Sequence, residues 1–258
     1  MQIERILANN PGPFTGSGTN TWLVDDGHGM TVVIDPGPID RVHWDRILNR
    51  LAERRPIGVL VTHTHPDHAP MANPLARELE VPAYGHAPGP DFDPDVMLGD
   101  GASLEVGRAR IDVVHTPGHA NDHLCFRVDD VLFTGDHIMG GSSVMVEDMG
   151  RYLDSLARLE GTGLVRLHPG HGDDMDDPDR VIGWYIAHRR QRHEQILEAV
   201  VGGASTITEV VEVVYADVDR SLHPLAARSV EAHLTLLRDQ GRIALSGDRV
   251  AEARPSPS

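Results

Sequence analysis

A histidine-rich segment that follows the apolar run at residues 59–61 constrains this sequence more than any other feature. Three histidines and an aspartate (His63, His65, Asp67 and His68) fall within six positions, directly after a run typical of a buried strand. Alternate residues of a strand point to the same side, so the first two imidazoles can converge on one point. Zinc takes imidazole nitrogens and carboxylate oxygens as ligands at about 2.0–2.2 Å. The segment therefore predicts a metal site, and a histidine-rich surface loop is the alternative interpretation.

The same arrangement recurs three times later in the chain. Thr116-Pro-Gly-His119, Phe133-Thr-Gly-Asp136 and Pro169-Gly-His171 each place a histidine or an aspartate in a glycine-containing turn. Each turn comes at the end of an apolar run that reads as a strand. The recurrence indicates that His119, Asp136 and His171 belong to the same site as the first segment. His137 and His168 flank these residues and are interpreted as structural or supporting groups.

Together these motifs resemble the signatures of the metallo-β-lactamase superfamily, whose H-x-H-x-D-H sequence is present as His63-Thr-His65-Pro-Asp67-His68. The resemblance implies an α+β fold, a four-layer αββα sandwich with the site along one edge of its two sheets. It also implies two zinc ions, for which iron or manganese could substitute. Transferred motif by motif, the resemblance assigns His63, His65 and His119 to one ion, Asp67, His68 and His171 to the other, and Asp136 to both.

Within the superfamily, the chain is most similar to the beta-lactamase-like protein 2 and glyoxalase II-like group. The similarity lies in Asn10-Pro-Gly-Pro-Phe14, in Gly18-Thr-Asn-Thr21, in the segment from Tyr185 to Arg192, and in a C-terminal end that reads as a winged helix. We therefore expect a catalytic domain at residues 1–204 and a winged-helix-like domain at residues 205–258.

The spacing of apolar residues predicts an alternation of strands and helices along the whole chain. Residues 85–101 are rich in proline and glycine and are expected to be irregular. His43 and Trp44, in the first predicted helix, are interpreted as surface and packing residues. Strands are expected at 2–8, 19–24, 30–35, 57–61, 81–84, 103–106, 111–115, 123–128, 131–133, 164–167, 242–245 and 249–252, and helices at 39–54, 69–80, 147–160, 178–201, 206–215 and 224–240.

Composition limits the partners of the protein. The 258 residues carry 23 basic and 39 acidic side chains, a formal charge of −16, and all the basic residues are arginine. Such an acidic chain disfavours nucleic acid as a partner, and residues 205–258 carry six arginines against eight carboxylates. The single cysteine, Cys125, reads as a buried apolar residue. With no signal-like start and no apolar run of about 18 residues, we expect a cytoplasmic protein with no membrane partner. The oligomeric state is not readable from the sequence.

The chemistry of paired metal ions, together with the resemblance, predicts a hydrolase. Two zinc ions about 3.5–4 Å apart would share a water molecule whose pKa falls toward ~7, giving a metal-bridging hydroxide that attacks the substrate. Asp67 is the predicted catalytic residue, because its carboxylate can also accept a hydrogen bond from this nucleophile; metal ligation alone is the alternative.

A thioester or another activated ester, either a small molecule or a carrier-bound acyl group, is the predicted substrate. The alternative is a metal-dependent endoribonuclease of the beta-lactamase-like protein 2 type, with a lactonase as a weaker candidate. Asp136 argues against a β-lactamase, because the class B enzymes do not use such an aspartate as the bridging ligand. The winged-helix-like end argues against glutathione thioesters, since glyoxalase II has a helical glutathione-binding domain there.

Overall fold

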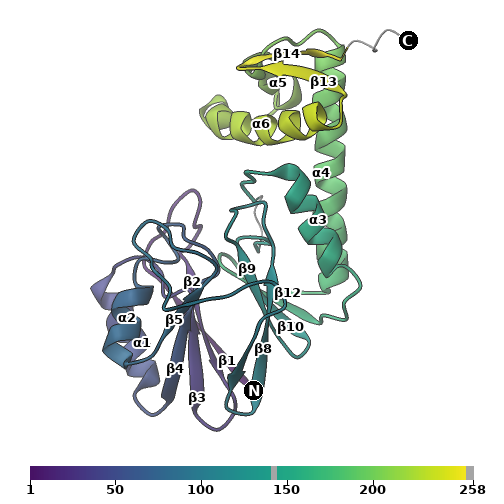
Figure 1. Ribbon diagram of the computed structural model, residues 1–258. Coiled ribbons are helices and arrows are strands. Elements are labelled where there is room, and N and C mark those ends of the chain that lie inside the picture. The colour runs from purple at the N-terminus through teal and green to yellow at the C-terminus, as the bar shows by residue number, and fades with distance from the viewer. Residues whose placement is uncertain (141–143, 254–258) are drawn as a thin grey trace. The chain divides into compact units, whose positions relative to one another are not determined.

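The computed structural model describes residues 1–140 and 144–253, and these form two compact units (Figure 1). The first unit contains both large sheets and helices α1 and α2. The second unit contains α3, most of α4 and the C-terminal helices with their hairpin. The division into domains at 1–204 and 205–258 stays a prediction.

The first sheet has six strands in sequential order, antiparallel from β1 to β3 and parallel from β3 to β6. Parallel neighbours need a crossover, and α1 and α2 supply the first two. Asp40 caps the N-terminus of α1, because its carboxylate accepts a hydrogen bond from the backbone amide of His43 at 2.6 Å. The elements are β1 (Gln2–Leu7), β2 (Asn20–Asp25), β3 (Met30–Ile34), α1 (Arg41–Leu51), β4 (Arg55–Leu60), α2 (Ala72–Leu79), β5 (Ala83–Gly85) and β6 (Val96–Met97).

The second sheet also has six strands, in the order β12-β11-β10-β9-β8-β7. Only β10 and β11 are parallel neighbours, and the other pairs are antiparallel. Its strands are β7 (Ser103–Val106), β8 (Ala109–His115), β9 (Leu124–Val128), β10 (Val131–Gly135), β11 (Arg166–Pro169) and β12 (Met175–Asp176).

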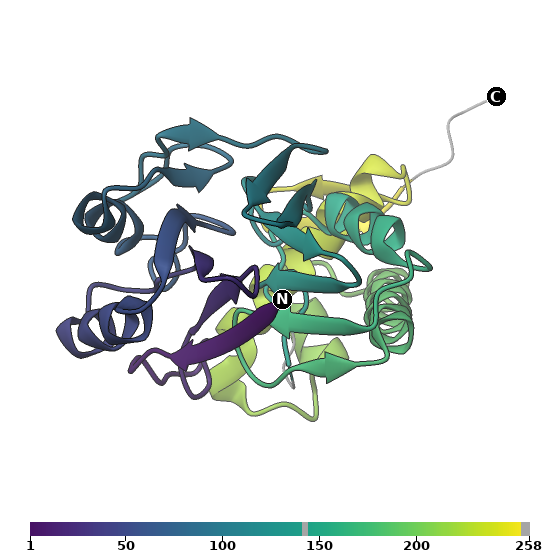
Figure 2. The same cartoon turned by 90° about the horizontal axis from the view of Figure 1, so that it is seen from below.

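Two apolar layers hold the first unit together. One layer lies between the sheets, where Trp22, Val32 and Leu60 pack with Ile111 and Phe126. The other lies between the outer face of the first sheet and the two helices, as Figure 2 shows. Because β2 and β3 are buried on both faces, β3 apart from Thr31 and the middle of β2 (Trp22, Leu23 and Val24) are apolar.

The second unit has its own core, built where α4, α5, α6 and the hairpin meet. Helix α5 begins at Thr206, whose hydroxyl accepts a hydrogen bond from the amide of Glu209 at 3.2 Å, while the Glu209 carboxylate accepts one from the amide of Ser205 at 2.7 Å. The elements are α3 (Met149–Leu159), α4 (Pro178–Val201), α5 (Ile207–Val214), a 3-10 turn (Arg220–Leu222), α6 (His223–Asp239), β13 (Ile243–Ser246) and β14 (Arg249–Glu252).

The mixed α/β class with sheets flanked by helices is confirmed, and most predicted elements occur within a few residues of their expected ends. Three differences concern short or irregular segments. Strand β6 lies inside the stretch expected to be irregular, and β12 was not predicted; each has two residues, too few to show a period. Helix α2 begins at Ala72 rather than at residue 69, because the preceding residues form turns around His65.

His43 was interpreted as a surface and packing residue, and its placement at the surface was wrong. Its side chain is fully buried, and Nε2 lies 2.8 Å from the hydroxyl of Thr21. That hydroxyl donates to the carbonyl of Asp35 at 2.7 Å, so it accepts from the Nε2–H of His43. Burial lowers the pKa of His43 to about 4, against the smaller opposing effect of the Asp40 carboxylate.

We predict that His43→Gln reduces the dependence of stability on pH. In the folded wild type His43 stays neutral down to about pH 4, whereas in the unfolded chain it takes up a proton near pH 6.5. The unfolded state therefore binds more protons in this window, and its titration removes on the order of 2 kcal/mol of stability as the pH falls from 6.5 to 4. Denaturant titrations of both proteins at pH 7.0 and 4.5 measure this. An equal loss of stability in the two proteins would contradict the prediction.

Candidate metal centre

All seven predicted residues lie in turns that follow strands, in two groups. Within each group, the ligand atoms lie within 4.8 Å of one another. Strand β4 leads into the segment that carries His63, His65, Asp67 and His68, whereas the other residues follow β8, β10 and β11. The first group is His63, His65 and His119, and the second is Asp67, His68, Asp136 and His171. The structure thus brings the predicted residues together, and their roles as ligands stay a prediction.

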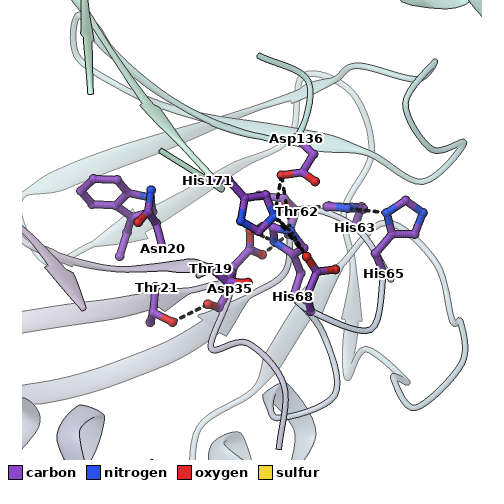
Figure 3. Close-up of polar contacts among 12 residues, drawn as sticks. Thr19, Asn20, Thr21, Asp35, Thr62, His63, His65, His68, Asp136 and His171 are labelled. Carbon is purple, nitrogen blue, oxygen red and sulfur yellow. Dashed lines mark hydrogen bonds and ion pairs between the residues drawn. The ribbon is translucent and has the colours of Figure 1, made fainter. Parts of the chain in front are cut away.

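The second group is a compact set of two imidazoles and two carboxylates (Figure 3). The Nε2 atoms of His68 and His171 lie 3.2 Å apart. Asp67 Oδ2 lies 3.1 Å from Nε2 of His171, and Asp136 Oδ1 lies 3.4 Å from Nε2 of both histidines. Four donor atoms therefore face one small volume, which is the arrangement that a divalent cation requires.

In the first group, too, a ring nitrogen of one histidine faces a ring nitrogen of another. His63 Nε2 and His65 Nδ1 are 2.9 Å apart, and the planes of the two rings are inclined by 76°. Asp122 fixes the backbone between them, because its Oδ2 accepts a hydrogen bond from the amide of Thr64 at 2.9 Å.

Hydrogen bonds at Nδ1 leave Nε2 of the second-group histidines available for a metal. His68 Nδ1 lies 2.9 Å from Oδ2 of Asp35, and His171 Nδ1 lies 3.2 Å from the carbonyl oxygen of Gly18. Both partners are acceptors, so each Nδ1 carries the proton and donates it. This arrangement is typical of metal-binding histidines, whose other ring nitrogen is oriented by a carboxylate or a carbonyl.

His63 and His119 are oriented in the same way. The Thr62 hydroxyl donates to Asp35 at 2.7 Å, so it accepts from His63 Nδ1 at 3.0 Å. His119 Nδ1 donates to the carbonyl oxygen of Met145 at 2.7 Å. In its neutral form, each of these histidines therefore presents Nε2 as the acceptor nitrogen.

Asp35 was missed as a site residue, although its position at the end of β3 follows the same strand-end pattern. Its side chain accepts hydrogen bonds from the amide and the hydroxyl of Thr62, at 2.8 and 2.7 Å, as well as from His68. The residue has a positive φ of 50°, which aspartate tolerates better than most residues. Asp35 therefore connects β3, β4 and the ligand turn through one carboxylate.

His123 was also missed, and it positions Asp136. Its Nε2 accepts the backbone N–H of Asp136 at 3.2 Å, and its Nδ1 lies 2.8 Å from the hydroxyl of Thr116. Nothing near His123 in sequence marks it, because both partners are brought to it by strand pairing.

Glycines keep the second group open. A Cβ at Gly170 would lie 2.6 Å from Asp136 Oδ1 and 2.8 Å from a ring carbon of His68. At Gly135, which has φ +47°, a Cβ would lie 2.7 Å from His123 Nε2. The glycines in the predicted motifs are thus required by close approach to the site.

Without metal, the second group is held together by opposite charges. Burial raises the pKa of Asp136, but the charge of His68 and hydrogen bonds from His171 and His68 outweigh it and hold this pKa well below its usual range. Burial lowers the pKa of His68, but Asp136 and Asp35 outweigh it and raise this pKa well above its ordinary value. Burial also lowers the pKa of His171, but the carboxylates of Asp136 and Asp67 outweigh this effect and raise that pKa to about 9. Protons thus occupy the imidazoles that a metal ion would bind.

Asp67 and Cys125 have contrasting environments. Burial raises the pKa of Asp67, but the hydrogen bond from His171 and the charge of His68 outweigh it, so the group is a carboxylate at neutral pH. The Asp67 side chain retains 25% of its exposure, against 9% for Asp136. Cys125 is fully buried, which raises the pKa of its thiol to about 12 and makes it unsuitable as a nucleophile.

The chain belongs to the metallo-beta-lactamase superfamily. Residues 14–182 match the model of the Metallo-beta-lactamase superfamily, and residues 206–251 match that of the Beta-lactamase associated winged helix domain. The protein is therefore a metal-dependent hydrolase, and the predicted winged-helix-like end is confirmed.

Curated relatives match nearly the whole chain. The Beta-lactamase-like protein 2 homolog of Drosophila melanogaster is 31% identical over 264 residues, covering 95% of this chain and 90% of the relative. The Atrochrysone carboxyl ACP thioesterase of Aspergillus chevalieri is 34% identical over 232 residues, covering 84% and 74%.

Solved structures agree on the fold. A Beta-lactamase domain protein from Burkholderia ambifaria has a TM-score of 0.84 and 23% identity, and the match covers 97% of this chain and 91% of that one. A protein solved in a di-iron-bound form has a TM-score of 0.54 and 27% identity over 72% of this chain and 97% of its own. Within the described part of this chain, no helix has the length and apolarity needed to cross a bilayer.

We predict that Asp35→Asn lowers metal affinity about 10- to 100-fold, the usual cost of losing a group that orients a metal-binding histidine. Asparagine places an N–H₂ group where the carboxylate accepts hydrogen bonds from His68 and Thr62. Competition with a chromophoric chelator measures the affinity. Asp112→Asn, which alters a half-exposed carboxylate paired with Arg110, is the matched control. Wild-type affinity in a folded Asp35→Asn protein would contradict the prediction.

Proposed function

We propose that this protein is a dinuclear metal hydrolase that cleaves acyl thioesters or similarly activated esters. The observation that carries the proposal is the pair of ligand groups, each with donor atoms within 4.8 Å of one another. Two ions bound there would supply Lewis acidity for the acyl carbonyl and a water molecule acidic enough to attack it at neutral pH.

The donor set fits divalent transition metals. In the proposed assignment, His63, His65 and His119 would give one ion three nitrogen donors, and Asp67, His68 and His171 would hold the other ion. The Asp136 carboxylate would be shared by both ions. Nitrogen-rich sets of this kind suit zinc, iron and manganese, and availability in the cell selects among them. We propose zinc as the native metal, and the di-iron-bound relative supports iron as the second candidate.

Asp67 is the proposed catalytic residue. Its carboxylate is ionised, it is the more exposed of the two carboxylates, and its Oδ2 already lies 3.1 Å from His171. A carboxylate at this position can accept a hydrogen bond from an attacking water molecule and orient it toward the substrate. The Asp136 carboxylate is more buried and, in the proposed assignment, is shared by both ions, so it is less available for that role.

Charge and similarity favour a thioester over RNA. The chain carries a net charge of −16 with no lysine, so it repels an approaching polyanion at long range. The carrier-protein thioesterase from Aspergillus chevalieri supports thioester hydrolysis. The similarity to the Beta-lactamase-like protein 2 homolog keeps metal-dependent RNA cleavage as the second candidate.

We predict that His65→Ala and Asp136→Ala each lower bound metal below the wild-type content and reduce turnover by more than about 100-fold, because each removes a proposed donor. Metal content by mass spectrometry of the purified proteins, beside initial rates, measures both effects. His28→Ala, which alters an exposed turn histidine, is the control. A His65→Ala protein with full metal content and full rate would show that the ligand assignment is wrong.

The substrate class is decided by a panel assayed with one metal-loaded preparation. We expect turnover of acyl thioesters such as acetyl- and benzoyl-N-acetylcysteamine, and little cleavage of single-stranded RNA. The Asp67→Asn variant should lose most of the thioester rate while an intact His63–His65 group retains metal. Rapid RNA cleavage beside background thioester hydrolysis would reverse the choice between the two candidates.

A further inference from the structure

A cavity lies in the first unit, where β1 and β2 of one sheet meet β10, β11 and the residues just before β12 of the other. Its volume is about 760 Å³, within the range of about 300–1,000 Å³ usual for small-molecule sites. None of the seven proposed metal ligands lines it. The cavity and the proposed metal centre therefore have no lining residue in common.

Part of the lining of this edge cavity is apolar. It consists of Trp22, which is only 4% exposed, together with Ile3, Val131 and Val165. The His168 ring packs against Trp22 with centroids 4.7 Å apart, and its Nδ1 lies 3.2 Å from Asp174 Oδ1. An apolar ligand body would therefore meet aliphatic and aromatic surface with one oriented imidazole at its edge.

Two guanidinium groups stand at the rim with donors to spare. Arg5 bonds through Nη1 alone, to the carbonyl of Gly172 and to Asp173, at 3.1 and 3.2 Å. Arg166 uses Nε and Nη2 on Asp176. An arginine has five N–H donors in a planar fork that matches a carboxylate, so each retains donors for a ligand.

The acidic groups at the rim are weaker attractors for a ligand. The Asp173 side chain is 94% exposed, where solvent and salt screen its charge, and Asp174 is engaged with His168. Arg5 and Arg166 retain 40% and 49% of their side-chain exposure, so their charges are less screened.

We propose that this cavity binds an amphipathic monocarboxylate, with its apolar chain or ring over Trp22 and its carboxylate between Arg5 and Arg166. The site would accept a medium-chain or aromatic acid. The proposal does not depend on the substrate of the metal centre.

Binding here is connected to the segment that carries His171. The indole Nε1 of Trp22 donates to the carbonyl of Pro169 at 3.1 Å, and Arg5 donates to the carbonyl of Gly172. The two residues that would contact the ligand thus hold both ends of the Pro169–Gly172 turn. A carboxylate bound in the edge cavity should change metal affinity, and metal should change carboxylate affinity by the same factor.

Isothermal titration of the metal-loaded protein with octanoate, octanol and octylamine tests the site and its charge preference. We expect saturable 1:1 binding of octanoate, weaker binding of octanol and none of octylamine. If octylamine binds most tightly, the acidic groups dominate and the assigned ligand class is wrong. If octanoate shows no saturable binding, the site itself is wrong.

Two variants locate the binding. Val165→Glu places a carboxylate on a half-exposed position of the cavity wall and should abolish octanoate binding, whereas Arg166→Gln should weaken it about tenfold. Arg110→Gln removes an exposed arginine paired with an aspartate on the same sheet and should leave binding unchanged. Octanoate binding that survives Val165→Glu but disappears on metal removal would place the ligand at the metal centre and overturn the proposal.

Discussion

The arrangement of the metal centre depends on the buried carboxylate of Asp35. It accepts the backbone N–H and the hydroxyl of Thr62, which fixes the end of β4, and it accepts the ring N–H of His68 in the turn beyond. With three donors directed at one buried carboxylate, leaving any of these donors unpaired costs about 1–3 kcal/mol. The Thr62 hydroxyl in turn accepts a hydrogen bond from the ring of His63 and so orients that ring. Asp35, which belongs to neither group of proposed ligands, therefore sets the direction of imidazoles in both groups.

The glycines and the sheet topology then decide how closely the other residues approach. Strands β10 and β11 are parallel neighbours, so Asp136 and His171 emerge at the same edge. Gly170 lies between them with room for no side chain. The packed layers behind the strands leave these turns little freedom, because a close-packed core transmits small displacements instead of absorbing them. When metal is absent, the attraction between the carboxylates and the protonated imidazoles of the second group adds to this rigidity.

The sequence predicted the parts of this site that are local and missed those that depend on tertiary contacts. Histidines and aspartates just after an apolar run, in three of the motifs next to a glycine, are visible over a few residues of sequence. All seven of these residues lie in the two groups of the structure. Asp35 has the same local signal, but a single acid before Pro36-Gly37 cannot be told from a turn residue. His123 and His43 carry no local signal at all, because strand pairing and helix packing bring their partners to them. The two-residue strands β6 and β12 exist only because a neighbour pairs with them.

On the proposed function, the charge of the protein would separate substrates by size more than by sign. In the proposed assignment, two divalent ions with Asp67 and Asp136 leave the centre with a local charge of about +2. That field attracts a carbonyl oxygen or a single anionic group within a Debye length of about 8–10 Å. Beyond this distance the surface of a chain with net charge −16 dominates, and a polymer whose phosphates extend over several Debye lengths meets it before it meets the metals. A compact acyl thioester experiences mainly the first field and an RNA strand mainly the second, so the same centre can favour the ester without any residue that reads its structure.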